Sequence, residues 1–227
     1  DANATPLIDP RTGIAATGAA RYNPWVWFYS YAQKWQSVNG THFAGLGWET
    51  SQIDTAQLAY NANIADTNSW TISGQIDVTS DNALDILKDM AQAGGGTLTT
   101  RNGFLSATIN AAKTSVATIT DDDFAGKLTF GSASNLLERP NSVIPRFISE
   151  SNNWTVVDGS AVTDAAFVTA DKGFVRSQTI TLPYVANATQ AGKLAAYHLV
   201  NSREPFTFTL PLKPSMLHAA DVGEAIT

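Results

Sequence analysis

Hydrophobic and polar positions fall into helical and strand-like spacings along the chain, and the most apolar helical segment covers residues 23–35. Asn23 and Pro24 have the form of a helix start, because asparagine caps the first N–H groups and proline at the first position has none to satisfy. The apolar residues that follow share one helical face, with Trp27 and Tyr31 beside it. A helix that is apolar most of the way round must be buried on several sides or lie in a protein interface.

Other segments repeat apolar residues at helical spacing, namely 50–61, 81–93 and 189–201. The segment 81–93 gives the clearest pattern. Ser80 is its expected cap, and Gly94-Gly95-Gly96 is expected to end it.

Alternating patterns predict strands in the rest of the chain. The segments 97–100 and 104–109 predict a β-hairpin, because Asn-Gly at the tip is a strong hairpin signal. A strand with a bulge at Gly74 is predicted over 70–78. Beyond residue 113 the predicted strands are 116–119, 126–130, 142–148, 154–157, 175–182 and 206–212.

These elements predict an α+β fold with the strands concentrated in the second half. Residues 1–20 are small, polar and interrupted by proline and glycine, so we expect an extended arm or linker there. We expect an α+β domain over 21–113 and a β-rich domain with one packed helix over 114–227.

Composition narrows the classes of function. The chain has 227 residues, of which 44% are apolar and only 15% charged, which favours much buried surface, including subunit contacts. The 14 basic residues are dispersed among 20 acidic ones, giving a net charge of −6. A nucleic-acid binder normally presents a basic face, so we expect no specific DNA binding.

The sequence does not support cysteine chemistry or a membrane-spanning helix. The chain has no cysteine, which removes disulfides, thiol nucleophiles and cysteine-ligated zinc. No apolar run approaches the ~20 residues of a membrane-spanning helix, and no signal-peptide pattern is visible. The chain begins at Asp1 and ends at 222–227 in what reads as the start of a strand, so we expect it to be part of a longer protein.

No catalytic, metal-binding or cofactor-binding constellation emerges. His42, His198 and His218 lack metal-ligand spacing and are expected to be structural or surface residues. Asp121-Asp122-Asp123 lacks the spacing of a calcium loop and predicts a solvated turn or the start of a helical turn. Gly94-Gly95-Gly96 follows a helix, whereas phosphate loops precede one.

Short motifs follow one another in order between residues 23 and 223. They are Asn23-Pro24-Trp25-Val26-Trp27-Phe28-Tyr29 with Gly45-Leu46-Gly47; Asp77 to Gly95, with Ala83-Leu84-Asp85-Ile86-Leu87; Gly103-Phe104-Leu105; Val116-Ala117-Thr118-Ile119-Thr120-Asp121-Asp122-Asp123-Phe124; Arg139-Pro140-Asn141-Ser142-Val143; Gln190-Ala191-Gly192-Lys193-Leu194-Ala195; and Phe206-Thr207-Phe208-Thr209-Leu210-Pro211-Leu212 with Leu217 and Ala220-Asp221-Val222. In this order they resemble the central region of the lambda-type tail tip attachment proteins of long-tailed phages, and the related tail hub proteins of gene transfer agents. Two features depart from the family pattern and concern loop details: Ala220-Asp221 replaces Gly-Asp, and the loop from Ala32 to Gly45 differs.

The resemblance implies a non-enzymatic structural protein of the virion, made in the bacterial host cytoplasm. Such proteins form a ring, usually a homotrimer, that joins the tail tube to the tip or fibre during host attachment. The implied partners are other copies of the chain, the tail tube and distal tail proteins, and the tip fibre, while phage DNA leaves through the lumen without specific binding. The family implies a lateral domain over 21–113 and a tube-like domain, with β-barrel or sandwich elements, over 114–227.

Apolar residues on the aromatic helix and the last long strand are the interface candidates. They are Trp25, Trp27, Phe28, Tyr31, Phe206, Phe208 and Leu210.

Two other functions stay open from the residues. One is a carbohydrate-binding or glycosidase-like module of a phage tail, and the other is a generic interaction scaffold outside phages. The first would use aromatic rings with nearby acids, drawn from Trp25, Trp27, Tyr31, Trp48 and Trp70 with Glu49 or Asp54.

Overall fold

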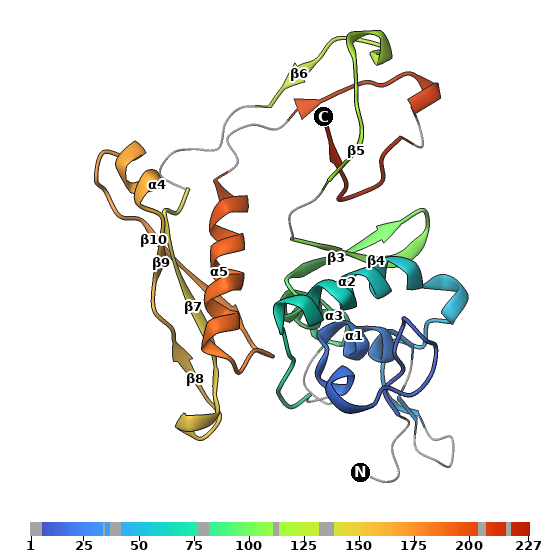
Figure 1. Cartoon of the computed structure of the whole chain (residues 1–227), viewed down its shortest axis with the longest axis vertical. Coiled ribbons are helices and arrows are strands. Elements are labelled where there is room, and N and C mark those ends of the chain that lie inside the picture. The colour runs from blue at the N-terminus through green and yellow to red at the C-terminus, as the bar shows by residue number, and fades with distance from the viewer. Residues whose placement is uncertain are drawn as a thin grey trace.

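The chain folds into helices packed with several small sheets, which confirms the predicted α+β class. The computed structural model describes residues 6–33, 35–36, 42–76, 82–110, 114–131, 139–203, 208–216 and 219–227. Figure 1 shows three parts: a helical layer with a hairpin, a sheet covered by one helix, and an extension at the C-terminal end. None of the sheets in these ranges closes into a barrel.

The aromatic helix α1, Pro24–Gln33, begins where the sequence predicts. The Asn23 side chain accepts a hydrogen bond from the Trp25 N–H at 2.9 Å and donates one to the Ala62 carbonyl at 2.9 Å. It therefore caps α1 and ties it to the next helix. The 3₁₀ turn η1, Gly18–Tyr22, leads into α1, and the Ile8 N–H donates to Ser30 Oγ at 2.8 Å. The first described residues thus contact α1.

The helix predicted over 50–61 forms later and runs longer. Thr50–Gln52 make a separate 3₁₀ turn, η2, and α2 covers Thr55–Asn68. The break falls at Ile53, which makes an isolated bridge to Leu105, and Asp54 then caps α2 by accepting from the Gln57 N–H at 3.1 Å.

The clearest predicted helix and hairpin are both confirmed. Helix α3 covers Ala83–Ala93 with Asn82 as its cap in place of the predicted Ser80, which lies outside the described residues. Strands β3, Gly96–Arg101, and β4, Phe104–Ile109, pair antiparallel. The turn residues Asn102 and Gly103 have φ values of 51° and 84°, as a type I′ turn requires.

The strand predicted over 70–78 is wrong for residues 71–76, which form no ladder, while 77 and 78 lie outside the described residues. The extended segment bonds to two different elements: the Ile72 N–H donates to the Tyr22 carbonyl at 2.8 Å, and the Ser73 N–H to the Tyr184 carbonyl at 3.0 Å. Gly74 is explained by contact rather than by a bulge. Its φ is 156°, and a Cβ there would lie 2.7 Å from Tyr184 Cδ1.

The larger sheet is built around β7, Ser142–Ser149. Strand β10, Ser177–Leu182, pairs parallel to it, whereas β8, Thr155–Asp158, and β9, Val162–Thr163, pair antiparallel. Pro145 lies between the stretches of β7 that pair with β9 and with β8, where a missing N–H disrupts least. The short helix α4, Ala165–Ala170, precedes β10, and α5, Ala188–Ser202, packs against β7.

The extension comprises residues 114–131, 208–216 and 219–227 at the top of Figure 1. Its paired strands are β5, Ser115–Ala117, with β12, Ala225–Ile226, and β6, Thr129–Phe130, with β11, Phe208–Thr209. They are shorter than predicted, and part of the 206–212 strand lies outside the described residues. The remaining elements are β1, Trp35–Gln36, β2, His42–Ala44, and the 3₁₀ turns η3, Asp121–Asp123, η5, Glu150–Asn152, and η6, Pro214–Met216.

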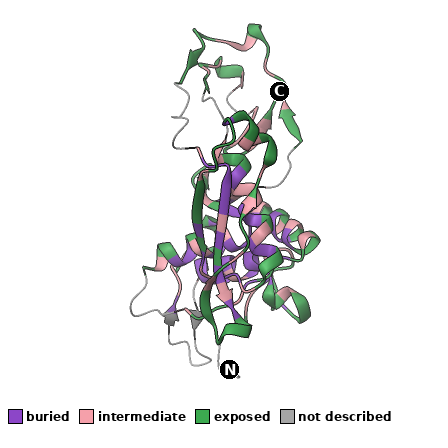
Figure 2. Cartoon of the chain, turned by 90° about the vertical axis from the view of Figure 1, so that its left-hand side faces the viewer, coloured by how far each residue is buried: buried purple, intermediate pink, exposed green. Residues whose placement is uncertain are grey.

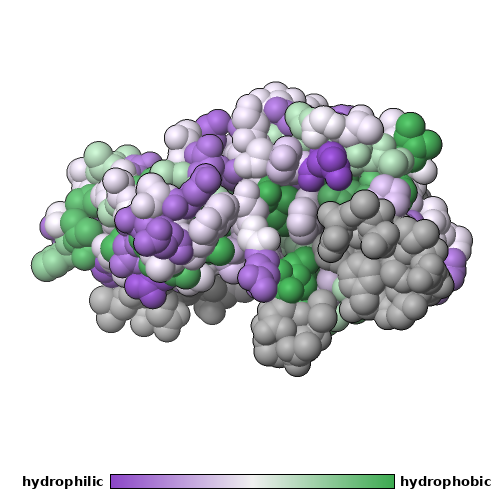
Figure 3. Space-filling model, turned by 90° about the horizontal axis from the view of Figure 1, so that it is seen from below, coloured by the Kyte–Doolittle hydropathy of each residue, from purple (hydrophilic) through white to green (hydrophobic). Residues whose placement is uncertain are grey.

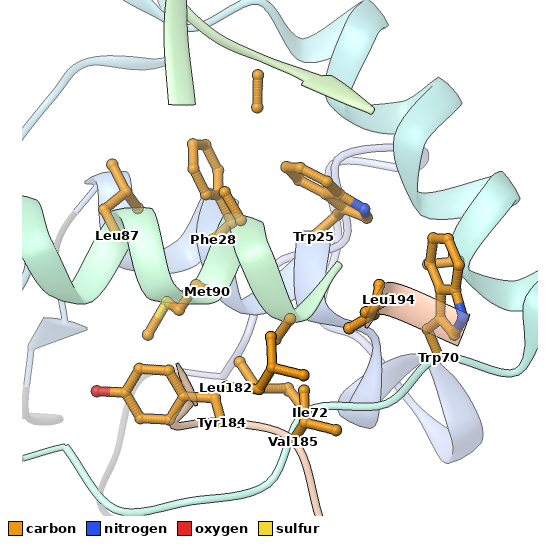
Figure 4. Close-up of a cluster of buried hydrophobic side chains, with 14 of the residues drawn as sticks. Trp25, Phe28, Trp70, Ile72, Leu87, Met90, Leu182, Tyr184, Val185 and Leu194 are labelled. Carbon is orange, nitrogen blue, oxygen red and sulfur yellow. The ribbon is translucent and has the colours of Figure 1, made fainter. Parts of the chain in front are cut away.

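One hydrophobic core joins the helical layer to α5 and the larger sheet. Figure 4 shows Trp25 and Met90 from the helical layer close to Leu182 and Leu194 from the second half of the chain. The two halves on either side of residue 113 therefore share buried side chains. Their division into two domains stays a prediction.

Candidate assembly surfaces

The extension is the part of the chain least covered by its own residues. None of its described residues is buried, and Figure 2 shows the buried residues gathered in the body below it. The rings of Phe130 and Phe208 meet edge to face with centroids 5.2 Å apart, yet their exposed fractions are 65% and 52%. A two-stranded ladder is marginally stable alone, so this pair of rings is a candidate contact surface for another protein.

A single arginine ties the extension to the hairpin. Arg101, the last residue of β3, donates to Asp221 Oδ2, Glu224 Oε1 and Gln57 Oε1, each at 2.8 Å. Burial acts to lower the pKa of Arg101, but the hydrogen bond to Asp221 and the charges of Asp221 and Glu224 outweigh it and raise the pKa. The charged guanidinium therefore holds the turn at residues 221–224 against the hairpin tip.

The larger sheet has two different edges, β10 on one side of β7 and β8 with β9 on the other. Strand β10 contains no proline or lysine, and its residues Ser177, Thr179 and Thr181 are exposed. Proteins commonly protect edge strands with proline or lysine. Because β10 has neither, it is a candidate for pairing with a strand of another chain. On the face seen from below, apolar residues are interspersed with hydrophilic ones and form no continuous patch (Figure 3).

A buried carboxylate explains the motif around Asn141. Asp171 accepts from Asn141 Nδ2 and Arg203 Nη1, each at 2.8 Å, and also pairs with Arg176. The Arg203 hydrogen bond, which outweighs burial, lowers the pKa of Asp171. The Arg203 guanidinium also lies 4.8 Å from the ring centre of Phe167. The cluster joins the start of β7 to the α4–β10 turn and the end of α5.

Gln190, the first residue of the motif over 190–195, also joins separate segments by hydrogen bonds. Its Oε1 accepts from the Thr71 N–H at 2.9 Å, and its Nε2 donates to the carbonyls of Thr71 at 3.0 Å and Ala93 at 2.9 Å. One buried amide therefore joins α5 to the extended segment and to the end of α3. The polar residues of both motifs hold the fold together.

The predicted interface residues lie in different environments. Trp25, Phe28 and Tyr31 have exposed fractions of 0%, 0% and 1%, because the chain's own core covers them. Trp27 is partly exposed, with its Nε1 donating to the Arg21 carbonyl at 2.7 Å. The other three candidates belong to the last predicted strand: Phe208 and Leu210 lie on the extension, and Phe206 lies outside the described residues.

Trp27, Phe208 and Leu210 have surface to offer a partner, and their place in an interface stays a prediction. Sequence reasoning missed Phe130 as the ring that meets Phe208. Both residues sit in predicted strands, but no sequence signal paired those strands.

Residues proposed for a sugar-binding alternative are mostly used by the fold. The rings of Trp25 and Trp70 are buried and offer no face to a ligand. Asp54 caps α2, and Glu49 stands at the start of η2, where its backbone N–H donates to Gln52 Oε1 at 2.9 Å. Trp48 is half-buried against the core.

Metal and acid–base chemistry find little support among the described residues. None of them form a group of three histidine, aspartate or glutamate side chains that could hold a metal ion. Burial lowers the pKa of His198, a half-buried residue on α5; His42 lies in β2, and His218 lies outside the described residues. Asp121–Asp123 form the predicted exposed helical turn, η3. In the part of the chain that the structure describes, no helix is long and apolar enough to cross a membrane.

Comparisons with known proteins find one matching family and solved structures of low similarity. Residues 82–224 match the family described as "Putative phage tail protein". No curated protein matches the chain. Among solved structures, the prophage tail protein gp18 from Listeria monocytogenes EGD-e matches at 15% identity and a TM-score of 0.36, over 67% of this chain and 44% of that one. The 43 kDa tail protein of prophage MuSo2 from Shewanella oneidensis matches at 16% identity and a TM-score of 0.36, over 72% and 49%. The chain spans less than half the length of each.

Proposed function

The chain belongs to the phage tail protein family that its residues 82–224 match, and from this membership we propose that it is a hub protein of the tail tip. In this role it forms a ring, a homotrimer, that joins the tail tube to the tip or fibre and lets DNA leave during infection. It acts as a non-enzymatic component of the virion and is made in the host cytoplasm.

The observation that carries this proposal is the extension without a core. Its described residues include exposed apolar side chains and none that is buried. Such a segment gains stability when another protein covers it, as happens in an assembly. The tail tube, the distal tail proteins and the tip fibre are the proposed neighbours on this surface.

The two unlike edges of the larger sheet support ring formation. If β10 of one copy pairs with β8 of the next, the contact is head-to-tail, and such contacts close into a ring when the rotation fits. Pairing would also satisfy backbone groups that both edges otherwise present to water.

The charges support a lumen that does not retain DNA. The net charge is −6, and each of the basic residues Arg11, Lys88, Arg101, Arg146, Arg176 and Arg203 is paired with a carboxylate. Basic side chains already neutralised within the chain displace few counterions from a phosphate backbone.

Light scattering on this chain and on a longer parent protein tests the proposal. We expect a trimer whose mass does not change with concentration, and ring-shaped particles in electron micrographs. Thr179→Lys with Thr181→Lys on β10 should give monomers, whereas the matched Thr100→Lys, exposed on β3, should keep the trimer. Monomers of both wild-type proteins would refute the hub. A trimeric parent with a monomeric chain would refute the β10–β8 contact.

A further inference from the structure

Two hollows run together beside the hairpin and share Gln57, Tyr60 and Arg101. One of about 330 Å³ lies between α2, β4 and the C-terminal turn, and the other of about 500 Å³ lies between α2 and the hairpin tip. Together they form a groove that passes along the Tyr60 ring. The volume of each hollow is in the range of pockets that hold small organic ligands.

Two exposed aromatic rings line the hollow between α2 and the hairpin tip. Tyr60 on α2 is 47% exposed and Phe104 at the start of β4 is 42% exposed, although both are large apolar rings. The core does not use these faces, unlike those of Trp25 and Trp70. An exposed ring beside a polar groove can receive the C–H face of a sugar ring, which is flat and weakly apolar.

The polar groups beside these rings are held in fixed positions. Asp54 Oδ2 accepts from Ser106 Oγ at 3.1 Å, and Arg101 fixes the carboxylates of Asp221 and Glu224 at 2.8 Å. A carboxylate has about four acceptor positions, so each of these groups keeps acceptors for further donors. Sugar hydroxyls are such donors, and acceptors fixed in advance reduce the entropy lost on binding.

The charge of the groove selects among saccharides. Asp54, Asp221 and Glu224 face one guanidinium, that of Arg101, so the groove carries an excess of negative charge. Phosphates and acidic sugars are repelled, whereas neutral and amino-bearing sugars are not. We propose that this groove, lined by Tyr60, Phe104 and the carboxylates around Arg101, binds a neutral or amino-bearing oligosaccharide.

The proposed activity is binding without cleavage. A glycosidase holds two carboxyl groups on opposite sides of the scissile bond. Here Asp221 and Glu224 both contact the same guanidinium, and the Asp221 N–H donates to Glu224 Oε2 at 2.8 Å. The inference does not depend on ring formation, because every residue of the groove comes from one chain.

Titration calorimetry and saturation-transfer NMR with three probes test the inference. Tri-N-acetylchitotriose is the neutral probe, chitosan trimer the amino-bearing one and sialyllactose the acidic one. We expect millimolar binding of the first two and none of the third. Tyr60→Ala and Phe104→Ala should each weaken binding by about tenfold, the value of one aromatic contact. Tyr60→Phe should retain binding, because it keeps the ring.

Tyr22→Ala is the matched control, because Tyr22 is 59% exposed and lies outside the groove. It should bind as the wild type does. Circular dichroism on every variant separates lost binding from lost folding. The inference is overturned if neither uncharged nor amino-bearing probe binds at ~10 mM, far above the expected range. It is also overturned if folded Tyr60→Ala and Phe104→Ala proteins bind unchanged, or if sialyllactose binds as tightly as chitotriose.

Discussion

Replacing Gln190 by leucine should lower the free energy of unfolding by several kcal/mol, although leucine has a similar size. Gln190 is 3% exposed and makes hydrogen bonds to Thr71 and Ala93 that reach 119 and 97 residues back along the chain. Leucine can form none of them. The substitution therefore removes the hydrogen bonds that join α5 to Thr71 and to the end of α3, without opening a large cavity.

The magnitude follows from the groups that lose a partner. The Ala93 carbonyl lies in a buried bond, and leaving it unsatisfied costs about 1–3 kcal/mol. The two Thr71 groups are only partly buried, so their lost bonds cost about 0.5–1.5 kcal/mol each. The sum is about 2–6 kcal/mol, a large share of the ~5–15 kcal/mol that stabilises a typical domain.

Urea unfolding followed by tryptophan fluorescence measures this loss. Gln75→Leu is the matched control, because Gln75 is exposed and should change the free energy by less than ~0.5 kcal/mol. Hydrogen exchange should also rise in α5 and at the end of α3 of the Gln190→Leu protein. A loss no greater than that of the control would refute the stabilising role of the Gln190 hydrogen bonds.

Three further changes test other parts of the fold. Gly96→Ala should destabilise the protein by about 3 kcal/mol or more in thermal unfolding, because a Cβ there would clash with the Thr108 carbonyl; an unchanged melting temperature would contradict this close approach. Because Arg203 lowers the folded pKa of Asp171, its stabilisation exists above the unfolded pKa and is lost as pH falls through the folded value. Unfolding at pH 2–5 should therefore depend on pH less steeply in Asp171→Asn, and equal slopes would count against the cluster. Burial lowers the pKa of His198, so below pH 6.5 the unfolded chain binds more protons than the folded one and the free energy of unfolding falls. His198→Gln should make this fall less steep, and a steeper fall in the variant would contradict the argument.

Local signals predicted the elements that depend on neighbouring residues. Asn23-Pro24 marks the start of α1, and Asn102-Gly103 marks the turn between β3 and β4. In each case the residue type satisfies a backbone requirement within a few positions, whatever the rest of the chain does. The sequence could therefore locate these features without knowledge of the tertiary structure.

Contacts between distant residues decided the features that were missed. Residues 71–76 have a strand-like pattern, but their backbone bonds go to Tyr22 and Tyr184, which no local pattern connects. The same reason hid the groove: Tyr60, Phe104 and Asp221 come from three separate segments. Helix α1 was predicted to lie in an interface because it is rich in aromatic residues. Most of its rings are instead buried in the core of the chain.

The residues that carry the sequence resemblance and the residues that would meet partners are different ones. Asn23, Asn141 and Gln190 stand in the motifs that carry the resemblance to tail tip proteins, and each is a buried polar side chain that joins distant segments. Replacing such a residue leaves buried groups without partners, so the fold constrains these positions strongly. Exposed residues such as Phe130 and Tyr60 can be replaced without leaving buried polar groups unpaired. If other proteins or sugars bind there, those partners set which residues are acceptable, and proteins that share this scaffold can differ in what they bind.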